Sequence, residues 1–238
     1  MMKRTILLMI ALMFVGMTAQ AASIDKLMDK VINAYGGEKK LNGITAMKMD
    51  LSIAVGAMNQ SIKLTAKDPD LFLLESEAMG QKMKAAYDGK KYMMDQGGNV
   101  MEVPPQAQGQ VKVQADQFQE FVKMGLTDYK TDGNTYKKIG RETVDGVDCI
   151  KVEVTKKDSE EKSILYINKA KYLIHQIVTD VTQGGQKTTT TVKIQDYKKV
   201  NGIMVAHKIE IKGQQNVTMT INKLEINPKI DNSVFTLK

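Results

Sequence analysis

The chain has 238 residues, a formal net charge of +7, a single cysteine and no tryptophan. One cysteine excludes an intramolecular disulfide, so the hydrophobic core must stabilise the fold unaided. The positive charge comes almost entirely from scattered lysines, with arginine only at Arg4 and Arg141, which argues against a nucleic-acid-binding protein.

Residues 1–21 have the pattern of a cleavable secretory signal. Lys3 and Arg4 precede an apolar run over residues 5–17, and Ala19-Gln20-Ala21 supplies the small residues that a signal peptidase requires. The alternative is a buried or membrane-spanning helix, but the run is shorter than the ~20 apolar residues of a span. We therefore predict export out of the cytoplasm as a soluble protein of 217 residues with a net charge of +5.

A helix is predicted over residues 24–35. Its apolar residues recur three and four positions apart, which places them on one side of a helix. They are Ile24, Leu27, Met28, Val31 and Ile32, and Gly36-Gly37 follows as a helix end.

After residue 46 the apolar period falls from 3.6 to 2, which indicates strands with one apolar face. The alternating segments are residues 47–55, 61–65, 150–154, 165–167, 192–194, 209–211 and 217–221. Turn dipeptides separate the strands at Asp88-Gly89, Gly97-Gly98, Asp132-Gly133, Asp145-Gly146, Gly184-Gly185 and Asn201-Gly202. Short connections predict an antiparallel meander of about ten or eleven strands, too many to lie flat, so the sheet should curl.

Pro104-Pro105 interrupts the strand pattern, and residues 106–126 are predicted to form one or two short helices. No Pro- or Ser-rich linker divides the chain, so residues 22–238 are expected to form a single domain.

No set of reactive residues indicates catalysis. His175 and His207 lie in separate strands without metal-ligand spacing, and Cys149 lies in an alternating strand where a small buried side chain is expected. We therefore expect no enzymatic activity, no metal and no cofactor. Twelve methionines follow residue 21, and flexible thioethers suit either ordinary core packing or a surface that repacks around apolar ligands.

Several motifs in order along the mature chain resemble the LolA/LolB-like family of periplasmic lipoprotein carriers. These are Ala34-Tyr35-Gly36-Gly37, Asp68-Pro69-Asp70-Leu71-Phe72, the Asp88-Gly89-Lys90-Lys91-Tyr92 turn, the Gly140–Cys149 segment, the Tyr197–Ala206 hairpin and the closing Asn227, Ile230 and Phe235. The chain departs from the family in having no arginine between Arg4 and Arg141 and in Ala206, where the family has proline. The mechanism that latches the lid and the identity of the cargo therefore stay open.

The resemblance implies an unclosed β-barrel of about eleven strands, with an N-terminal helix and lid helices over a hydrophobic cavity. It also implies that the protein binds acyl chains of lipoproteins or other lipids for transfer towards the outer membrane. An inner-membrane transporter and an outer-membrane acceptor would be its partners, and we expect it to act as a monomer.

The predicted cavity lining follows from strand alternation within this architecture. It comprises Met47, Met49, Leu51, Ile53, Ile62, Leu64, Leu71, Leu73, Met83, Tyr87, Ile209, Ile211 and Met219, with Phe118, Phe121 and Val122 in the lid. A register error of one residue would exchange the two faces of a strand. Two rival functions stay open: a periplasmic regulatory or sensor module that binds a protein or peptide, and a scaffold partner of outer-membrane assembly with a solid interior.

Overall fold

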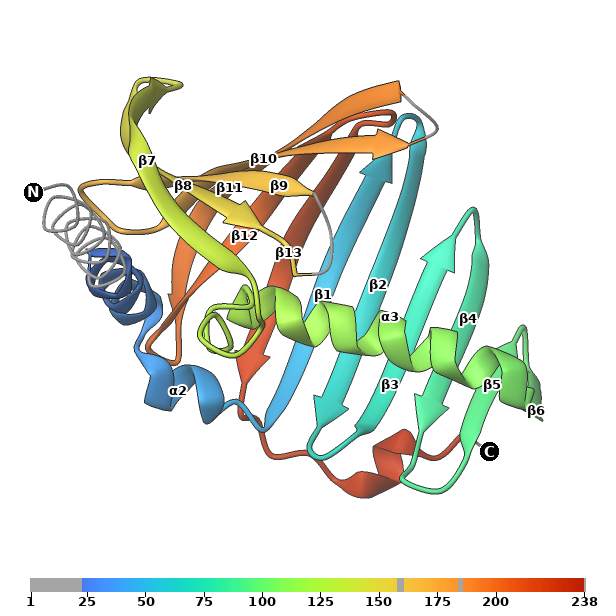
Figure 1. Ribbon diagram of the computed structural model, residues 1–238. Coiled ribbons are helices and arrows are strands. Elements are labelled where there is room, and N and C mark those ends of the chain that lie inside the picture. Colours follow the sequence, from blue (N-terminus) through green and yellow to red (C-terminus); the bar gives the residue numbers. More distant parts are fainter. Residues whose placement is uncertain (1–22, 158–160, 184–185, 238) are drawn as a thin grey trace, which may run out of the picture. The chain divides into compact units, whose positions relative to one another are not determined.

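The computed structural model describes residues 23–157, 161–183 and 186–237 (Figure 1). The predicted signal at residues 1–21 and the predicted turn at Gly184-Gly185 lie outside the described residues. The N-terminal helix covers residues 23–35, and all five residues of its predicted apolar stripe are buried. The 3.6-residue period therefore identified this helix correctly.

The remaining elements are predominantly strands. They are α2 (Glu38–Asn42), β1 (Ala46–Val55), β2 (Met58–Lys67), β3 (Leu71–Ala78), β4 (Gln81–Tyr87), β5 (Tyr92–Gln96), β6 (Asn99–Glu102), α3 (Pro105–Lys123), β7 (Thr135–Val144), β8 (Val147–Thr155), β9 (Lys162–Asn168), β10 (Ile174–Gln183), β11 (Gln186–Val200), β12 (Ile203–Lys212), β13 (Val217–Ile226) and the 3₁₀ helix η1 (Asn232–Phe235).

The strands follow the hydrogen-bonded order β6-β5-β4-β3-β2-β1-β13-β12-β11-β10-β9-β8-β7. Every register that the structure defines is antiparallel, and the end strands β6 and β7 do not pair with each other, so the sheet is open. The mainly β, antiparallel and unclosed fold is therefore as predicted. The described residues form thirteen strands rather than about eleven, and β5 and β6 among them are short and lack the apolar alternation that identifies a strand in the sequence.

Residue contacts divide the chain into two compact units. The first contains the described residues up to Ala34 together with Tyr129–Thr190, and the second contains Tyr35–Asp128 with Thr191–Lys238. Strand β11 crosses the boundary between them. We describe each unit by itself.

Two motifs that are far apart in the sequence meet in the second unit. The Tyr35 and Tyr197 hydroxyls form a hydrogen bond of 2.6 Å, and their rings pack edge to face with centroids 5.8 Å apart. Burial raises the pKa of Tyr197 far above its ordinary value, so the Tyr197 phenol stays protonated. Gly36 has φ +127°, and a Cβ built there would lie 2.8 Å from the Gly202 carbonyl oxygen. The Tyr-Gly-Gly helix end thus docks on the Asn-Gly hairpin.

Because this close approach involves backbone atoms, Gly36→Ala should be costly. We expect a loss of about 3 kcal/mol in the free energy of unfolding, measured by urea denaturation, from steric overlap together with a conformation that only glycine readily adopts. Gly56→Ala is the matched control, because Gly56 also has a positive φ but its Cβ would meet nothing within 4 Å. It should cost about 1 kcal/mol. Equal losses would contradict the docking argument.

The chain's last segment closes one side of the second unit. The Asn227 side chain accepts hydrogen bonds from the Thr45 and Ala46 backbone N–H groups and donates one to the Gly43 carbonyl. This arrangement directs the chain into η1, where Phe235 is fully buried in a cluster with Ile230 and strand residues of the same face. In the closing motif, Asn227 therefore holds the neighbouring backbone through hydrogen bonds, and Ile230 and Phe235 pack in the core.

Candidate functional site

In the second unit the sheet has two distinct faces, which the strand registers define. Helix α3 lies across one of them, and η1 packs on the other against β3 (Figure 1). We call these the α3 face and the η1 face. Within β1–β5 the α3 face is made of cross-strand rows, because directly paired residues of neighbouring strands point to the same side.

The two rows nearest α2 and η1 are almost entirely apolar. The first row is Met47, Ala66, Phe72, Tyr87 and Tyr92, and the second is Met49, Leu64, Leu74, Ala85 and Met94. Within them Met47, Met49, Leu64 and Phe72 are at most 2% exposed. These rows are packed rather than hollow.

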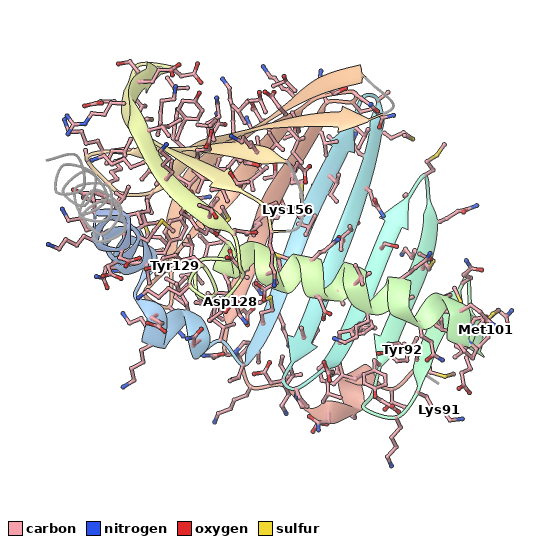
Figure 2. The ribbon with its side chains drawn as sticks, in the orientation of Figure 1. Lys91, Tyr92, Met101, Asp128, Tyr129 and Lys156 are labelled. Atoms are coloured by element: carbon pink, nitrogen blue, oxygen red, sulfur yellow. The ribbon has the colours of Figure 1, made fainter. Side chains whose placement is uncertain are left out.

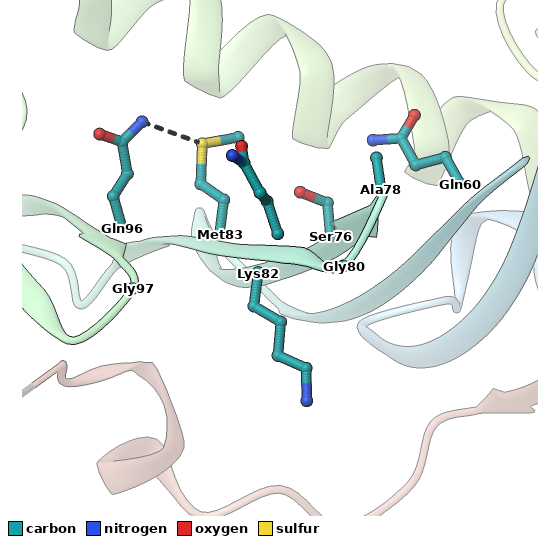
Figure 3. Close-up of a pocket in the computed structure, with 9 residues that line it drawn as sticks. Gln60, Ser76, Ala78, Gly80, Lys82, Met83, Gln96 and Gly97 are labelled. Atoms are coloured by element: carbon teal, nitrogen blue, oxygen red, sulfur yellow. Dashed lines mark hydrogen bonds between the residues drawn. The ribbon is translucent and has the colours of Figure 1, made fainter. Parts of the chain in front are cut away.

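The next two rows become polar towards the hairpin tips. The third row is Leu51, Ile62, Ser76, Met83 and Gln96, and the fourth is Ile53, Gln60, Ala78 and Gln81. A hollow of about 750 Å³ opens here, lined by Gln60, Ser76, Ala78, Gly80, Gln81, Lys82, Met83, Gln96 and Gly97. Figure 3 shows Gln60, Ser76, Met83 and Gln96 pointing to the side on which α3 lies, whereas Lys82 points away.

The polar rows place amide and hydroxyl groups in this hollow, and the Gln96 side-chain nitrogen lies 3.8 Å from the Met83 sulfur. A hollow that borders both amides and a packed apolar layer is chemically amphipathic. It differs from the purely apolar cavity that the sequence predicted.

Helix α3 begins because Pro104-Pro105 supplies a proline at the first helical position, and it ends at Met124, which has a left-handed conformation. Among its described side chains, Ala115 and Val122 are fully buried, whereas Val113 is 54% exposed. Gln106, Gln110 and Gln117 on the same helix are exposed. Among the described side chains of α3, the apolar contact with the sheet therefore comes from Ala115 and Val122.

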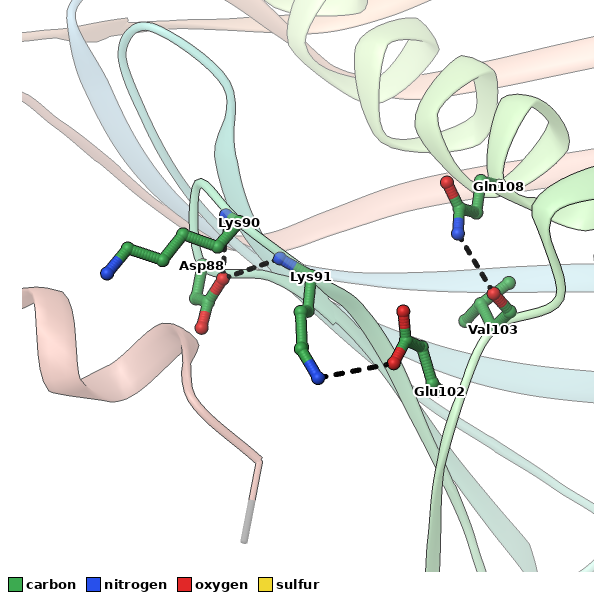
Figure 4. A network of polar contacts seen from close by, with 6 residues as sticks. All are labelled: Asp88, Lys90, Lys91, Glu102, Val103 and Gln108. Carbon is green, nitrogen blue, oxygen red and sulfur yellow. Dashed lines mark hydrogen bonds and ion pairs between the residues drawn. The ribbon is translucent and has the colours of Figure 1, made fainter.

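Polar contacts tie α3 to the sheet near its middle and its start. The Lys112 ammonium lies 3.1 Å from Asp70 in the β2–β3 turn and 2.9 Å from Asp116 in the same helix. The hydrogen bond to Asp116 raises the pKa of Lys112, so this cation is present at all physiological pH values. The Gln108 amide donates to the Val103 carbonyl at 3.0 Å (Figure 4).

An aromatic cluster lies on the same face near Lys112. The Tyr87 and Tyr92 rings stack at 4.2 Å, and Phe72 contacts Tyr92 at 6.2 Å between ring centroids. Tyr92 lies next to α3 in Figure 2, and burial raises the pKa of its phenol.

The turn between β4 and β5 explains the Asp-Gly-Lys motif. The Asp88 carboxylate accepts hydrogen bonds from the backbone N–H groups of Lys90 and Lys91, which lower its pKa (Figure 4). Lys91 in turn lies 3.4 Å from Glu102 on β6. This motif therefore positions the β4–β5–β6 edge.

Eleven of the thirteen predicted cavity residues share one face of the sheet in the second unit. Met47, Met49, Leu51, Ile62, Leu64 and Ile209 are buried, Ile53, Tyr87, Ile211 and Met219 are half-buried, and Met83 is 40% exposed. The registers of β1 with β13 and of β12 with β13 place Met219, Ile209 and Ile211 on the same side as Ile53 and Val55.

The prediction was wrong for Leu71 and Leu73. They pair with Lys67 and Thr65 and point to the η1 face, where both join the cluster with Phe235. Strand β3 opens with the four apolar residues Leu71–Leu74, all buried, because this strand is covered on both faces. Alternation cannot assign a face in such a run.

Sequence reasoning missed Phe72 and Leu74, which take the α3 face in place of Leu71 and Leu73, and the polar residues Gln60, Ser76, Gln81 and Gln96. Their positions along the strands relative to Met83 are the sequence signal that would have placed them on the same face as Met83. Of the predicted lid residues, Val122 is buried within α3, and the side chains of Phe118 and Phe121 lie outside those that the structure describes.

The described residues contain no group of three or more His, Cys, Asp and Glu side chains that could hold a metal ion. His207 is buried and lies within hydrogen-bond distance of the Val205 carbonyl, and Cys149 is buried in β8, as expected for structural roles. Of the helices that the structure describes, none combines the length and apolar character needed to cross a membrane.

Solved structures with a similar fold include proteins of three bacteria. A DUF1329 family protein of Desulfovibrio piger matches with TM-score 0.53 and 14% identity, covering 89% of this chain and 96% of that one. A LolA superfamily protein of Nitrosomonas europaea matches with TM-score 0.51 and 12% identity, covering 87% and 96%. A putative outer membrane lipoprotein-sorting protein domain of Vibrio parahaemolyticus matches with TM-score 0.50 and 12% identity, covering 83% and 92%.

The open antiparallel sheet with helices is thus a LolA-like fold, in agreement with the resemblance of the motifs. A family profile described as "Uncharacterized protein" matches residues 119–238, half of the chain, and the chain belongs to that family. Comparison with curated protein sequences gives no match.

The Lys112–Asp70 ion pair predicts a local effect on α3. Asp70→Asn should increase hydrogen exchange of the α3 backbone amides about two- to fivefold, because it removes a charged link between the helix and the β2–β3 turn, while global stability falls by less than ~1 kcal/mol. Glu77→Gln removes an equally exposed carboxylate whose partner Lys82 lies on β4, and should leave α3 exchange unchanged. Unchanged exchange in Asp70→Asn would show that this pair does not hold the helix.

Proposed function

We propose that this protein is a periplasmic carrier that binds acyl chains of lipoproteins or other lipids on the α3 face and transfers them towards the outer membrane. The observation that carries the proposal is the order of the cross-strand rows. Two packed apolar rows rich in methionine and aromatic residues adjoin an amphipathic hollow on the face that α3 covers. The LolA-like fold supports the same class of function.

An amphiphilic ligand, with a polar group at one end and hydrocarbon at the other, would match the hollow and the adjoining apolar rows. Its polar group would lie among the amides of Gln60, Gln81 and Gln96, and its hydrocarbon would extend over the apolar rows. A hollow of about 750 Å³ is within the ~300–1,000 Å³ usual for small-ligand sites.

Since the apolar rows are packed in this structure, α3 must move for a chain to lie along them. The gross gain from burying a sixteen-carbon chain is ~12 kcal/mol, at ~0.8 kcal/mol per methylene, before ordering costs are subtracted. That gain can offset the free energy needed to displace α3, which acts as a reversible cover in this proposal. Methionines at Met47, Met49, Met83 and Met94 can repack around chains of different shape.

The absence of tryptophan from the sequence permits a direct test. Ser76→Trp places a single fluorophore in the hollow, and Glu77→Trp places one on the next residue, which is exposed and faces away. Titration with a lysophosphatidylglycerol below its critical micelle concentration should shift the emission of the Ser76→Trp variant to the blue and leave the emission of the Glu77→Trp variant unchanged. Identical responses would indicate nonspecific adsorption, and no response with either variant would contradict acyl-chain binding at this face.

Carrier activity requires transfer as well as binding. Protein purified from its host should carry lipid in native mass spectrometry, and donor vesicles loaded with lipoprotein should lose cargo to the protein when a competent inner-membrane transporter is present. Bound lipid without transfer would support a lipid sensor instead. A lipid-free protein that co-purifies with a stable protein partner would support the regulatory or scaffold alternatives.

A further inference from the structure

The first unit contains a hollow of about 290 Å³ whose rim is cationic. Four lysines and one arginine line it: Lys26 and Lys30 from the N-terminal helix, Lys138 and Arg141 from β7, and Lys169 from the β9–β10 turn. None of the described residues that line it is acidic. Its floor is apolar, because Leu27 and Ile150 are buried there. Three separate elements therefore direct positive charge towards one small space.

A β-bulge brings the two β7 cations to the same side. Residues three apart in a regular strand point to opposite faces, yet the register of β7 shifts between Lys138 and Gly140. Lys138 consequently pairs with Val152 and Arg141 pairs with Ile150, which lie two residues apart on β8 and share a face. Gly140 lies at the bulge and has φ +144°, a backbone conformation that favours glycine. Without the extra residue the hollow would lose one of these charges.

The turn between β9 and β10 is held rigidly beside the hollow. The Asn168 side chain accepts hydrogen bonds from the N–H groups of Ala170 and Lys171, and the Tyr172 N–H donates to the Asn168 carbonyl at 2.7 Å. Tyr172 has φ +56°, an uncommon conformation for a bulky residue. It places the phenol in the lining, where its hydroxyl accepts a hydrogen bond of 3.3 Å from Lys30.

The charges in this hollow are only partly neutralised. Lys169 forms an ion pair of 3.0 Å with Asp148. The Lys30 ammonium lies 5.1 Å from the centre of the Tyr172 ring, a contact that leaves its charge in place. Five cations line the hollow and none of its described lining residues is acidic, so the lining favours an anion.

We propose that this hollow binds the phosphate group of a phosphate ester. A phosphate offers several oxygens to donors that approach from different directions, as the helix, the bulged strand and the turn do here, and lysine is a common phosphate ligand. The hydroxyls of Ser23 and Tyr172 add neutral hydrogen-bonding groups to the lining. The apolar floor favours an ester over free inorganic phosphate, because the carbon moiety of an ester can pack against the floor. Such a group occurs in a soluble ester or in the headgroup of an anionic phospholipid.

Two probes distinguish these sources. Glycerol 3-phosphate added to the ¹⁵N-labelled protein should shift the amide resonances of residues 26–30 and 169–172, with inorganic phosphate giving smaller shifts. Sedimentation with phosphatidylcholine vesicles that contain phosphatidylglycerol tests the membrane source, with pure phosphatidylcholine as the reference. Vesicle binding that weakens with salt identifies a lipid headgroup, whereas shifts without vesicle binding identify a soluble ester.

The variant Lys138→Gln/Arg141→Gln should weaken binding of the responding probe about tenfold or more, since each cation near an anionic group contributes several-fold. Lys137→Gln/Lys199→Gln removes the same charge from exposed residues outside the hollow and should change binding less than twofold. Equal losses in both variants, or no response to any probe, would overturn the proposal. Because the hollow belongs to a different unit from the α3 face, its failure would leave the acyl-chain proposal intact.

Discussion

The structure depends above all on the register of its antiparallel backbone hydrogen bonds. A strand side chain has only two directions available, so register decides which residues share a surface. On the α3 face it aligns Met49, Leu64 and Leu74 into an apolar row and Ser76, Met83 and Gln96 into a mixed one. In β7 a register shift of one residue places two cations on the same face, whereas regular alternation would place them on opposite faces.

The two faces of the second unit are covered by different kinds of contact. On the η1 face the covering segment is anchored by the Asn227 hydrogen bonds and by Phe235, which is completely buried. On the α3 face the cover is a glutamine-rich helix, with Ala115 and Val122 buried among its described side chains and a partly exposed ion pair through Lys112.

The two proposed sites use different physical interactions. Binding at the α3 face would come mainly from burial of hydrocarbon, which is insensitive to salt and tolerant of ligand shape. Binding at the hollow of the first unit would come from exposed cations such as Lys138 and Arg141, and would be screened by salt. An amphiphile with an anionic phosphate contains both kinds of group, but each site stands on its own residues.

Local interactions let the sequence by itself determine the N-terminal helix, the hairpin turns and most strands, because a helix period, a glycine with positive φ and apolar alternation each involve neighbouring residues. It also placed eleven of the thirteen predicted cavity residues on one face. Only the tertiary structure decided the position of the hollow and the face on which Leu71 and Leu73 lie. Alternation could not assign that face, since β3 is apolar on both sides. Those depend on which distant segments cover each face, and no local pattern encodes that choice.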